Sequence, residues 1–327
     1  SFCFAPRSKT CGVGVLLIVT GCASGGRFMV VAQPVADVRS QPHTVAQPNV
    51  HDPLQETQLL YGERVRLVRR EDDWAKIEAV EQAEYTHGQT WQSYPGWVHA
   101  EALIPWEEEA RYPTIVITTK WATLWRTPYK TDTASWRLPL GSQLQGVDLG
   151  GVLWQVELLD GSSAWISHEE ARSLDELRAL PVEVKRQRVL RAAEQFLGDP
   201  YYWGGRSPFA GPSGSDVTGV DCSALVNLAY RTVGLAIPRD AHEQSLRATP
   251  ITTLRPADLI FLSEPGNPKR IVHVMLYADG GTVIEGPGTG QHVRRIAVAE
   301  RLGQPAETLV PGTIVNDQTV SFGAYLP

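Results

Sequence analysis

Cys222 is the residue of this sequence with the clearest potential for covalent chemistry. It stands in the run GVDCSALVNLAYRTVGL (219–235), where an aspartate precedes it and a helix-spaced apolar run follows it. The pattern predicts that Cys222 begins a helix, where free backbone N–H groups and a partial positive charge favour a thiolate. The same N–H groups can stabilise an oxyanion. Two interpretations remain open from this run alone, a buried structural thiol and a nucleophile.

The N-terminal segment has the order of features that is typical of an export signal. Arg7 and Lys9 precede the apolar run 13–19, and small residues follow. That run is too short to span a bilayer, which needs ~20 residues. We therefore expect residues 1–21 to be a signal peptide and residues 22–27 a tether. The phrase VTGC resembles the lipobox of bacterial lipoproteins, which implies that Cys22 carries lipid.

The four cysteines narrow the interpretation of Cys222. Cys3 and Cys11 lie in the segment expected to be removed, and Cys22 is expected to be lipidated. Cys222 is then left without a disulfide partner, although an exported protein folds in an oxidising compartment. One cysteine cannot make a thiolate zinc site, and we expect neither a metal nor a cofactor.

A nucleophilic cysteine needs a base, which is most often a histidine. His273 lies in IVHVMLYADGGTVIEG (271–286), which reads as a strand, a turn and a second strand. In a strand His273, Met275 and Tyr277 share one face, so the imidazole could point toward the helix that carries Cys222.

The chain before residue 176 predicts two small all-β units. Strand-like runs with turn residues between them fill 28–106 and 112–175, and DDWAKIEA and GWVHAEAL of the first unit align with VLWQVELL and AWISHEEA of the second. A charged linker is expected over 176–188. Helical patterns followed by strands over 186–327 predict an α+β domain.

The first unit resembles the bacterial SH3 (SH3b) domain, a small barrel, in the phrases ADVRSQP, YGERV, DDWAKI and GWV. The second unit is more diverged and keeps ATLWRTP and the tryptophans. The resemblance implies two SH3b-like barrels ahead of the α+β domain.

The α+β domain is similar to the NlpC/P60 cysteine peptidases. The phrases FLGDPYYWGG, GVDCSALV, IPRDAHEQ, ADLIFL and HVMLYADGGTVIEG carry this resemblance in order and spacing. It implies a papain-like fold in which Cys222 attacks an amide carbonyl, His273 is its base, and a third polar residue orients His273.

Two residues compete for the third position. The family's usual position lies on the strand after the His273 strand and falls on Glu285 here, where the family most often has histidine. A three-residue loop at Asp279-Gly280-Gly281 would place Glu285 on the face of His273, whereas a two-residue loop would not. A glutamate can accept the imidazole N–H and stabilise the imidazolium. We favour Glu285, with His292 as the alternative.

The resemblance also implies the substrate contacts. Tyr201 is expected near the oxyanion site, and Trp203 is expected to line the pocket. Asp221 and Ser223 flank the nucleophile. In SH3b-bearing relatives an aspartate and the SH3b module bind the free α-amine of an N-terminal L-Ala, which we assign to Asp221 together with the module residues Tyr94 and Glu63.

With SH3b units, an NlpC/P60 domain resembles the γ-D-glutamyl-L-diamino-acid endopeptidases. We expect hydrolysis of peptidoglycan stem peptides that carry diaminopimelate or lysine, by a monomer anchored in the cell envelope, on the periplasmic side of the outer membrane in a Gram-negative cell. The net charge of −6 argues against nucleic acid. Two alternatives remain: an inactive wall-binding protein, and a papain-like amidase or acyltransferase acting on another amide or ester.

Overall fold

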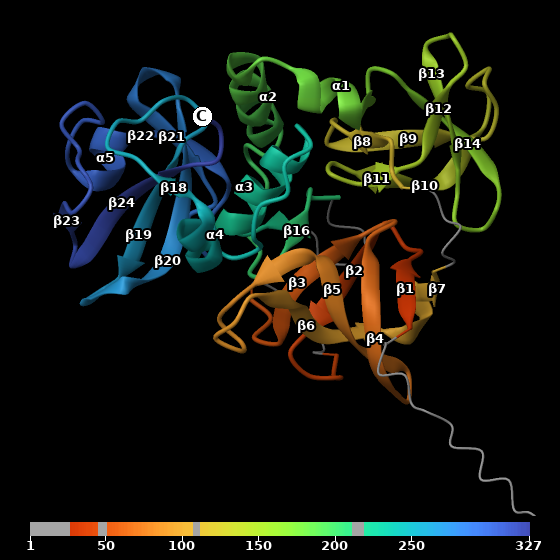
Figure 1. The fold of residues 1–327 in the computed structure, drawn as a ribbon, viewed down its shortest axis with the longest axis horizontal. Helices are drawn as coiled ribbons and strands as arrows, with labels where there is room; N and C mark the ends of the chain where they lie inside the picture. The colour runs from red at the N-terminus through yellow and green to blue at the C-terminus, as the bar shows by residue number, and fades with distance from the viewer. Residues whose placement is uncertain (1–26, 45–50, 107–111, 211–218) are drawn as a thin grey trace, which may run out of the picture.

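The computed structural model describes residues 27–44, 51–106, 112–210 and 219–327. The expected signal peptide and lipidated Cys22 lie outside these ranges. Figure 1 shows an orange β domain, a yellow-green β domain, and a C-terminal domain whose sheet is blue. None of the helices in the described ranges combines the length and the apolar character that crossing a bilayer requires.

The first domain is a single antiparallel sheet. Its strands are β1 (Phe28–Val31), β2 (Val35–Arg39), β3 (Gln55–Leu60), β4 (Arg64–Glu71), β5 (Trp74–Glu84), β6 (Gln92–His99) and β7 (Leu103–Pro105), paired in the order β3-β2-β6-β5-β4-β1-β7. Alternate residues of β4 show why the strand forms: Val65 is buried in the core, whereas Arg64 and Arg66 are partly exposed on the other face.

The sheet does not close into the barrel that the sequence predicted. Among the described strands, β3 and β7 lie at the two ends of the pairing order and are not paired with each other. The C-terminal domain contacts β3 instead. There the backbone N–H of Arg206 donates to the Gln58 side chain at 2.7 Å.

The second domain consists of two small sheets, and these also do not form one closed barrel. The described strands are β8 (Ile115–Ile117), β9 (Trp121–Trp125), β10 (Thr133–Pro139), β11 (Gln143–Leu144), β12 (Gly146–Asp148), β13 (Leu153–Glu157), β14 (Ser163–Ser167) and β15 (Ala171–Ser173). They pair in the orders β10-β9-β14-β13-β12 and β11-β8-β15.

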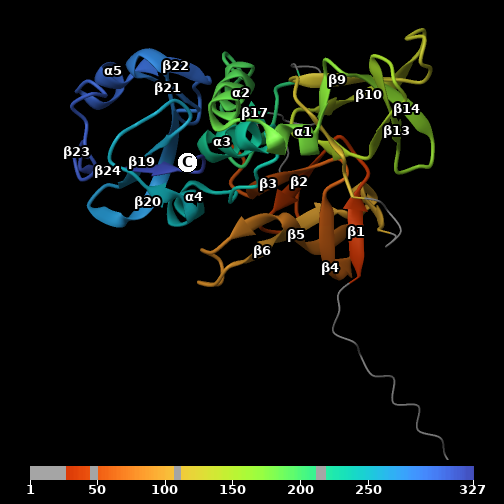
Figure 2. The same ribbon diagram turned by 45° about the horizontal axis from the view of Figure 1, so that its top comes forward.

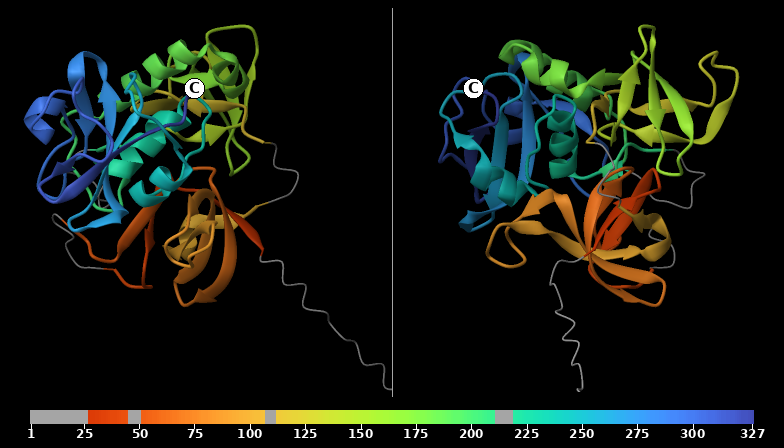
Figure 3. Two further views of the ribbon diagram at one scale, coloured as in Figure 1. Left: turned by 60° about the vertical axis from the view of Figure 1, so that its left-hand side comes forward. Right: turned by 45° about the vertical axis from the view of Figure 1, so that its right-hand side comes forward.

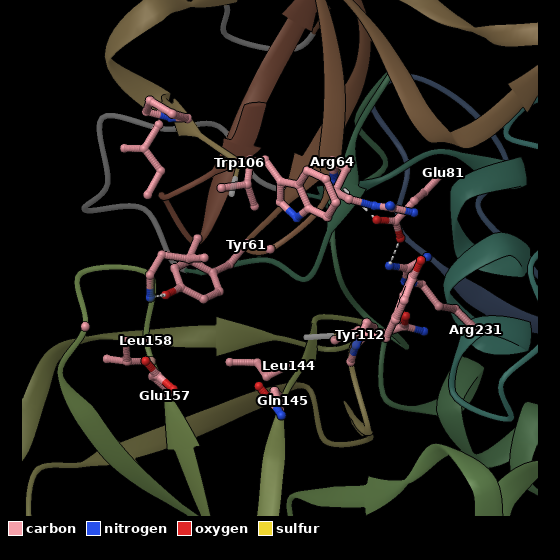
Figure 4. Close-up of a pocket in the computed structure, with 18 of the residues that line it drawn as sticks. Tyr61, Arg64, Glu81, Trp106, Tyr112, Leu144, Gln145, Glu157, Leu158 and Arg231 are labelled. Atoms are coloured by element: carbon pink, nitrogen blue, oxygen red, sulfur yellow. Dashed lines mark hydrogen bonds and ion pairs between the residues drawn. The ribbon is translucent and has the colours of Figure 1, made fainter. Parts of the chain in front are cut away.

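An open cleft of about 1020 Å³ separates the two β domains (Figure 4). Tyr61 of the first domain crosses to the second, where its side chain joins the apolar core and its hydroxyl oxygen accepts from the backbone N–H of Leu159 at 2.7 Å. The Arg64 guanidinium carbon lies 5.5 Å from the centroid of the Trp106 ring. Cys222 and His273 do not line this cleft.

Two helices occupy most of the segment that the sequence predicted as a linker. They are α1 (Leu174–Ala179) and α2 (Val182–Glu194). The Ser173 hydroxyl caps α1 by accepting from the backbone N–H of Glu176. Pro181 separates the helices because a proline disfavours helical backbone in the residue before it, and Leu180 is indeed extended, with ψ 146°.

The C-terminal domain has the predicted α+β order. Its helices are α3 (Cys222–Arg231), α4 (Ala241–Arg247) and α5 (Val298–Leu302). Its strands are β16 (Arg206–Ser207), β17 (Gly219–Val220), β18 (Thr249–Pro250), β19 (Leu259–Glu264), β20 (Asn267–Ala278), β21 (Thr282–Glu285), β22 (Arg294–Ala297), β23 (Ile314–Val315) and β24 (Gln318–Ala324). The main sheet runs β18-β24-β19-β20-β21-β22, and α3 packs on β20.

The α3 helix lies at the centre of the molecule. Every residue of it is buried, and its apolar side chains share one core with those of α2, β19 and β20. In Figure 2 the main sheet and the second β domain lie on opposite sides of α2 and α3. In Figure 3 the orange first β domain lies beside the teal helices of the C-terminal domain, and Arg231 at the end of α3 pairs with Glu81 of the first domain at 2.7 Å.

Candidate active site

Asp221 fixes the point at which α3 begins, and thereby places Cys222 in the first helical turn. Its backbone is extended, and its Oδ1 accepts from the backbone N–H of Ala224 at 2.7 Å. An aspartate in this position satisfies one of the free N–H groups of the first turn. Cys222 is a free thiol with 8% of its surface exposed.

His273 extends from β20 toward the beginning of α3. Its Nε2 atom lies 2.7 Å from Oε2 of Glu285, which leaves Nδ1 for the hydrogen bond that the imidazole makes with Cys222. The side chain of His273 is 11% exposed and that of Glu285 is fully buried. Thiol, imidazole and carboxylate therefore form a continuous chain of hydrogen bonds.

The β20–β21 hairpin explains how Glu285 reaches His273. Strand pairing joins Leu276 to Ile284 and Ala278 to Thr282, around the three-residue loop 279–281. Gly280 takes the left-handed backbone conformation in this loop, with φ 67°. The three-residue loop predicted from the sequence is confirmed, and its register puts residues 273 and 285 on one face.

His292 has a different environment. It is exposed, and its backbone forms a bridge with Pro200. No hydrogen bond or ion pair between described residues joins it to His273. The geometry therefore favours Glu285 over His292 as the residue that orients the imidazole.

The charges of the site stabilise one another. Burial opposes the imidazolium, but the Cys222 thiolate and the bonds to Cys222 and Glu285 outweigh it and raise the pKa of His273 to about 9. Burial likewise opposes the carboxylate of Glu285. The hydrogen bond and charge of His273, with Arg301 and Arg294, nevertheless lower its pKa to about 2. At neutral pH His273 is therefore protonated and Glu285 ionised.

Arg294 and Arg301 are site residues that the sequence analysis missed. Both guanidinium groups contact the Glu285 carboxylate. A cross-strand partner of Glu285 could have been found from the strand pattern, because β22 follows β21 directly. The contribution of α5 had no comparable signal in the sequence.

Asp221 and Ser223 do not face the substrate side in the way that the sequence analysis expected. Asp221 is 7% exposed, and Oδ1 accepts from Ala224, Ser223 and Arg239 while Oδ2 accepts from Gly204 and Arg239. A carboxylate has about four lone-pair sites, so none is left for a substrate amine. The hydroxyl of Ser223 lies 3.0 Å from Nη1 of Arg239 and belongs to the same buried network.

Tyr201 precedes a tight turn before α3 and Trp203 lies in it, where the backbone N–H of Gly205 donates to the carbonyl of Tyr202 at 3.0 Å. Tyr201 is 9% exposed, and burial together with the charges of Cys222 and Asp221 raises the pKa of its phenol far above the ordinary value. Trp203 is 48% exposed, and its ring centroid lies 5.6 Å from that of His51 in the first domain. Tyr201 thus lies near the nucleophile and Trp203 at the surface.

Gly286 allows the chain after β21 to pass close to the nucleophile. A Cβ atom at this position would lie 3.5 Å from the backbone nitrogen of Cys222 and 3.3 Å from the Tyr201 ring. The glycine therefore leaves room at the N–H group that would stabilise an oxyanion on Cys222.

Tyr94, Glu56 and Asp240 form an acidic cluster where the first and C-terminal domains meet. The Tyr94 hydroxyl lies 3.4 Å from Oε2 of Glu56 and also hydrogen-bonds Asp240. The side chains of Glu56 and Asp240 are 26% and 36% exposed. Burial raises the pKa of both carboxyl groups, and for Asp240 burial together with the charges of Asp221 and Glu243 raises the pKa to about 7. The sequence predicted Tyr94 as a substrate contact but gave no sign of its two acidic neighbours.

The acidic cluster adjoins the nucleophile through Arg239. This fully buried arginine pairs with Asp221, the residue before Cys222, at 2.8 Å, and with Asp240 at 3.4 Å. Its Nε atom donates to Thr57 of the first domain at 2.7 Å. One guanidinium therefore links the start of α3, the acidic cluster and the first domain.

Glu63 is not part of this acidic cluster, and its expected role in substrate binding is corrected. Its side chain is 2% exposed, and its two oxygens accept from Arg206 at 2.9 and 3.1 Å. Arg231 lies 3.2 Å from one of the same oxygens. A substrate amine has no access to a carboxylate that is buried and paired in this way.

The fold and the site together define a thiol hydrolase domain in which a helix bears the cysteine and a sheet bears the histidine. Residues 198–310 match the model of the NlpC/P60 family. The C-terminal domain therefore belongs to the NlpC/P60 family of cysteine peptidases.

Similarity to other proteins extends beyond that domain. The chain is 28% identical to a γ-D-glutamyl-L-lysine dipeptidyl-peptidase of Bacillus cereus, over 74% of this chain and 70% of that protein. It is 25% identical to the Bacillus subtilis protein of the same name, over 77% and 78% of the two chains. A crystal structure of an NlpC/P60 family protein from Bacillus cereus has the same fold, with a TM-score of 0.69 at 22% identity over 92% of this chain and all of that one.

Proposed function

We propose that this protein hydrolyses the amide between the γ-carboxyl of D-glutamate and the α-amine of an L-diamino acid, diaminopimelate or lysine, in cell-wall peptides. The observation that carries the proposal is the position of His273, hydrogen-bonded between Cys222 and Glu285. The site supplies a nucleophile, a base and an orienting carboxylate. The relatives named for γ-D-glutamyl-L-lysine cleavage align with most of this chain, which supports this choice of bond.

The reaction follows from the order of the three side chains. The Cys222 thiolate attacks the γ-carbonyl carbon, and the N–H groups at the beginning of α3 stabilise the oxyanion that forms. His273 then gives its proton to the departing amine of the diamino acid, which leaves a thioester on Cys222. A water molecule attacks the thioester while His273 takes its proton, and the D-glutamyl product leaves as a carboxylic acid.

The acidic cluster suits an N-terminal amine, in place of the contacts first assigned to Asp221 and Glu63. The hydroxyl of Tyr94 hydrogen-bonds the carboxyl groups of both Glu56 and Asp240, and these two side chains are partly exposed. Burial opposes the ionisation of both carboxyl groups, so an ammonium group that binds beside them would stabilise their charged forms. The proposed substrate accordingly begins with a free L-Ala, as in peptides released from the wall.

The sequence phrases of the two β domains and their all-β structure support SH3b-type modules whose sheets are not closed barrels. In this proposal the first module forms one wall of the substrate site, because it supplies Glu56 and Tyr94. The proposed location is the cell envelope, with a monomer anchored through lipid on Cys22. Metabolic labelling with palmitate tests the anchor: label is expected in the wild-type protein and absent from Cys22→Ser, and an unlabelled wild type would reject it.

The amine contact is tested with a matched pair of peptides, L-Ala-γ-D-Glu-L-Lys and its N-acetylated form. The free peptide should be cleaved with a kcat/KM at least about tenfold higher, since acetylation removes the charge that the acidic cluster would bind. Equal rates for the two peptides would reject the amine contact, and cleavage of neither would reject the choice of bond.

A further inference from the structure

Glu285 is a fully buried carboxylate with three cationic neighbours. Besides His273, Arg294 donates to Oε1 from Nε at 3.1 Å and from Nη2 at 2.8 Å. Arg301 donates from Nε to both oxygens at 3.1 Å. Oε1 and Oε2 together accept five hydrogen bonds, which fills the roughly four lone-pair sites of a carboxylate.

The arginines come from two further elements of the same domain. Arg294 is the direct cross-strand partner of Glu285 in the β21–β22 ladder, and Arg301 extends from α5. Their side chains are 40% and 23% exposed, so each guanidinium reaches the buried carboxylate from the surface. The neighbouring Arg295 has another partner, Glu194 at 3.0 Å.

The charges around Glu285 show what the arginines contribute. His273 faces it from β20, Arg294 from β22 and Arg301 from α5, and Cys222 of α3 lies beyond His273. With His273 alone, the buried carboxylate would share one cation with the Cys222 thiolate. Burial favours the protonated form of such a carboxylate, whereas two permanent guanidinium charges favour its anion.

We propose that Arg294 and Arg301 are positioning residues that hold Glu285 as an oriented anion, so that His273 presents Nδ1 to Cys222 as a stable imidazolium. They act through Glu285 and do not contact the substrate. In the family that the sequence resembles, the residue at the position of Glu285 is most often a histidine. A histidine is not an anion, so it does not need cationic partners of this kind. The inference rests on the thiol-hydrolase part of the proposed function and is independent of which peptide is cleaved.

The test measures alkylation of Cys222 by iodoacetamide as a function of pH, followed by mass spectrometry of the intact protein. This reaction reports the thiolate and needs no peptide substrate. The variants are Arg294→Gln, Arg301→Gln, the double glutamine variant, and the corresponding lysine substitutions. Arg295→Gln serves as the matched control, because it removes an arginine from the same strand without touching Glu285.

In the double glutamine variant the acid limb of the alkylation profile should move up by about one pH unit or more, since protonation of Glu285 then weakens the imidazolium. The lysine variants, which keep the positive charge, should keep the acid limb close to its wild-type position, and Arg295→Gln should match the wild type. In the peptide assay, kcat of the double variant should fall about tenfold with KM nearly unchanged.

A folded double glutamine variant with the wild-type alkylation profile would overturn the inference. If the double variant does not fold, the alkylation profile of Arg294→Gln is the test, because Arg294 is partly exposed. An unchanged acid limb in that variant would also contradict the inference. A wild type that is alkylated with the expected profile but cleaves no γ-D-glutamyl peptide would reject the proposed substrate and leave this inference standing.

Discussion

The carboxylate of Glu63 and the guanidinium of Arg206 form a two-bond ion pair, at 2.9 and 3.1 Å, that joins the first β domain to the peptidase domain. Neither side chain is more than 2% exposed. Arg231 of α3 contacts the same carboxylate, and the charges of the two arginines lower the pKa of Glu63 against the effect of its burial. The first domain is thus an integral part of the peptidase.

Glu63→Gln should lower the free energy of unfolding by about 3–5 kcal/mol, because it leaves two buried arginines without their shared anion. Urea unfolding measures the change. The control Glu78→Gln removes one partner of the partly exposed Arg66–Glu78 pair and should cost less than about 1 kcal/mol. Equal effects of the two substitutions would contradict the buried role of Glu63.

Glu285→Gln should reduce kcat by about 10²-fold or more, because an amide in place of the carboxylate cannot stabilise the imidazolium of His273. His292→Ala should leave kcat within about twofold, since the exposed His292 lies outside the hydrogen-bond chain of the described site. Steady-state kinetics on one peptide substrate compares the two variants. Full activity of Glu285→Gln with loss in His292→Ala would reverse the assignment.

The sequence was sufficient for the part of the site that depends on local pattern. The helix start at Cys222 and the strand of His273 follow from hydrophobic spacing, and the loop at Gly280 sets the strand register that brings Glu285 to His273. These features need few long-range contacts, so the sequence predicted them.

Features that depend on how the domains meet were missed or misassigned. Glu56 and Asp240 lie far apart in the sequence and in different domains, and no local spacing connects them. Glu63 was misassigned because the phrase YGERV does not reveal that Glu63 is buried against Arg206. The segment predicted as a linker holds most of α1 and the first part of α2, with Pro181 between the two helices.

The stability of the protein should fall as pH rises from about 6.5 to about 9 through the titration of His273. Its pKa is about 9 in the folded protein against an ordinary 6.5, so its contribution is complete below the lower value and lost above the higher one. Urea unfolding of the wild type and of His273→Asn over this range measures the difference. Parallel pH curves for the two proteins would contradict the raised pKa.

Glu56→Gln should raise KM for a peptide with a free N-terminal L-Ala by about tenfold or more and change kcat little, because the ammonium loses one of its two carboxyl partners. KM for the N-acetylated peptide should stay the same. Glu101→Gln, an exposed position of the same domain, is the control. A fall in kcat with unchanged KM would place Glu56 outside the amine contact.

Product analysis of L-Ala-γ-D-Glu-diaminopimelate by mass spectrometry tests the central claim most directly. We expect the wild-type protein to release L-Ala-D-Glu and free diaminopimelate, and Cys222→Ala to release neither. The contradictory results are an intact peptide after incubation with folded wild-type protein, cleavage at another bond, or equal cleavage by Cys222→Ala.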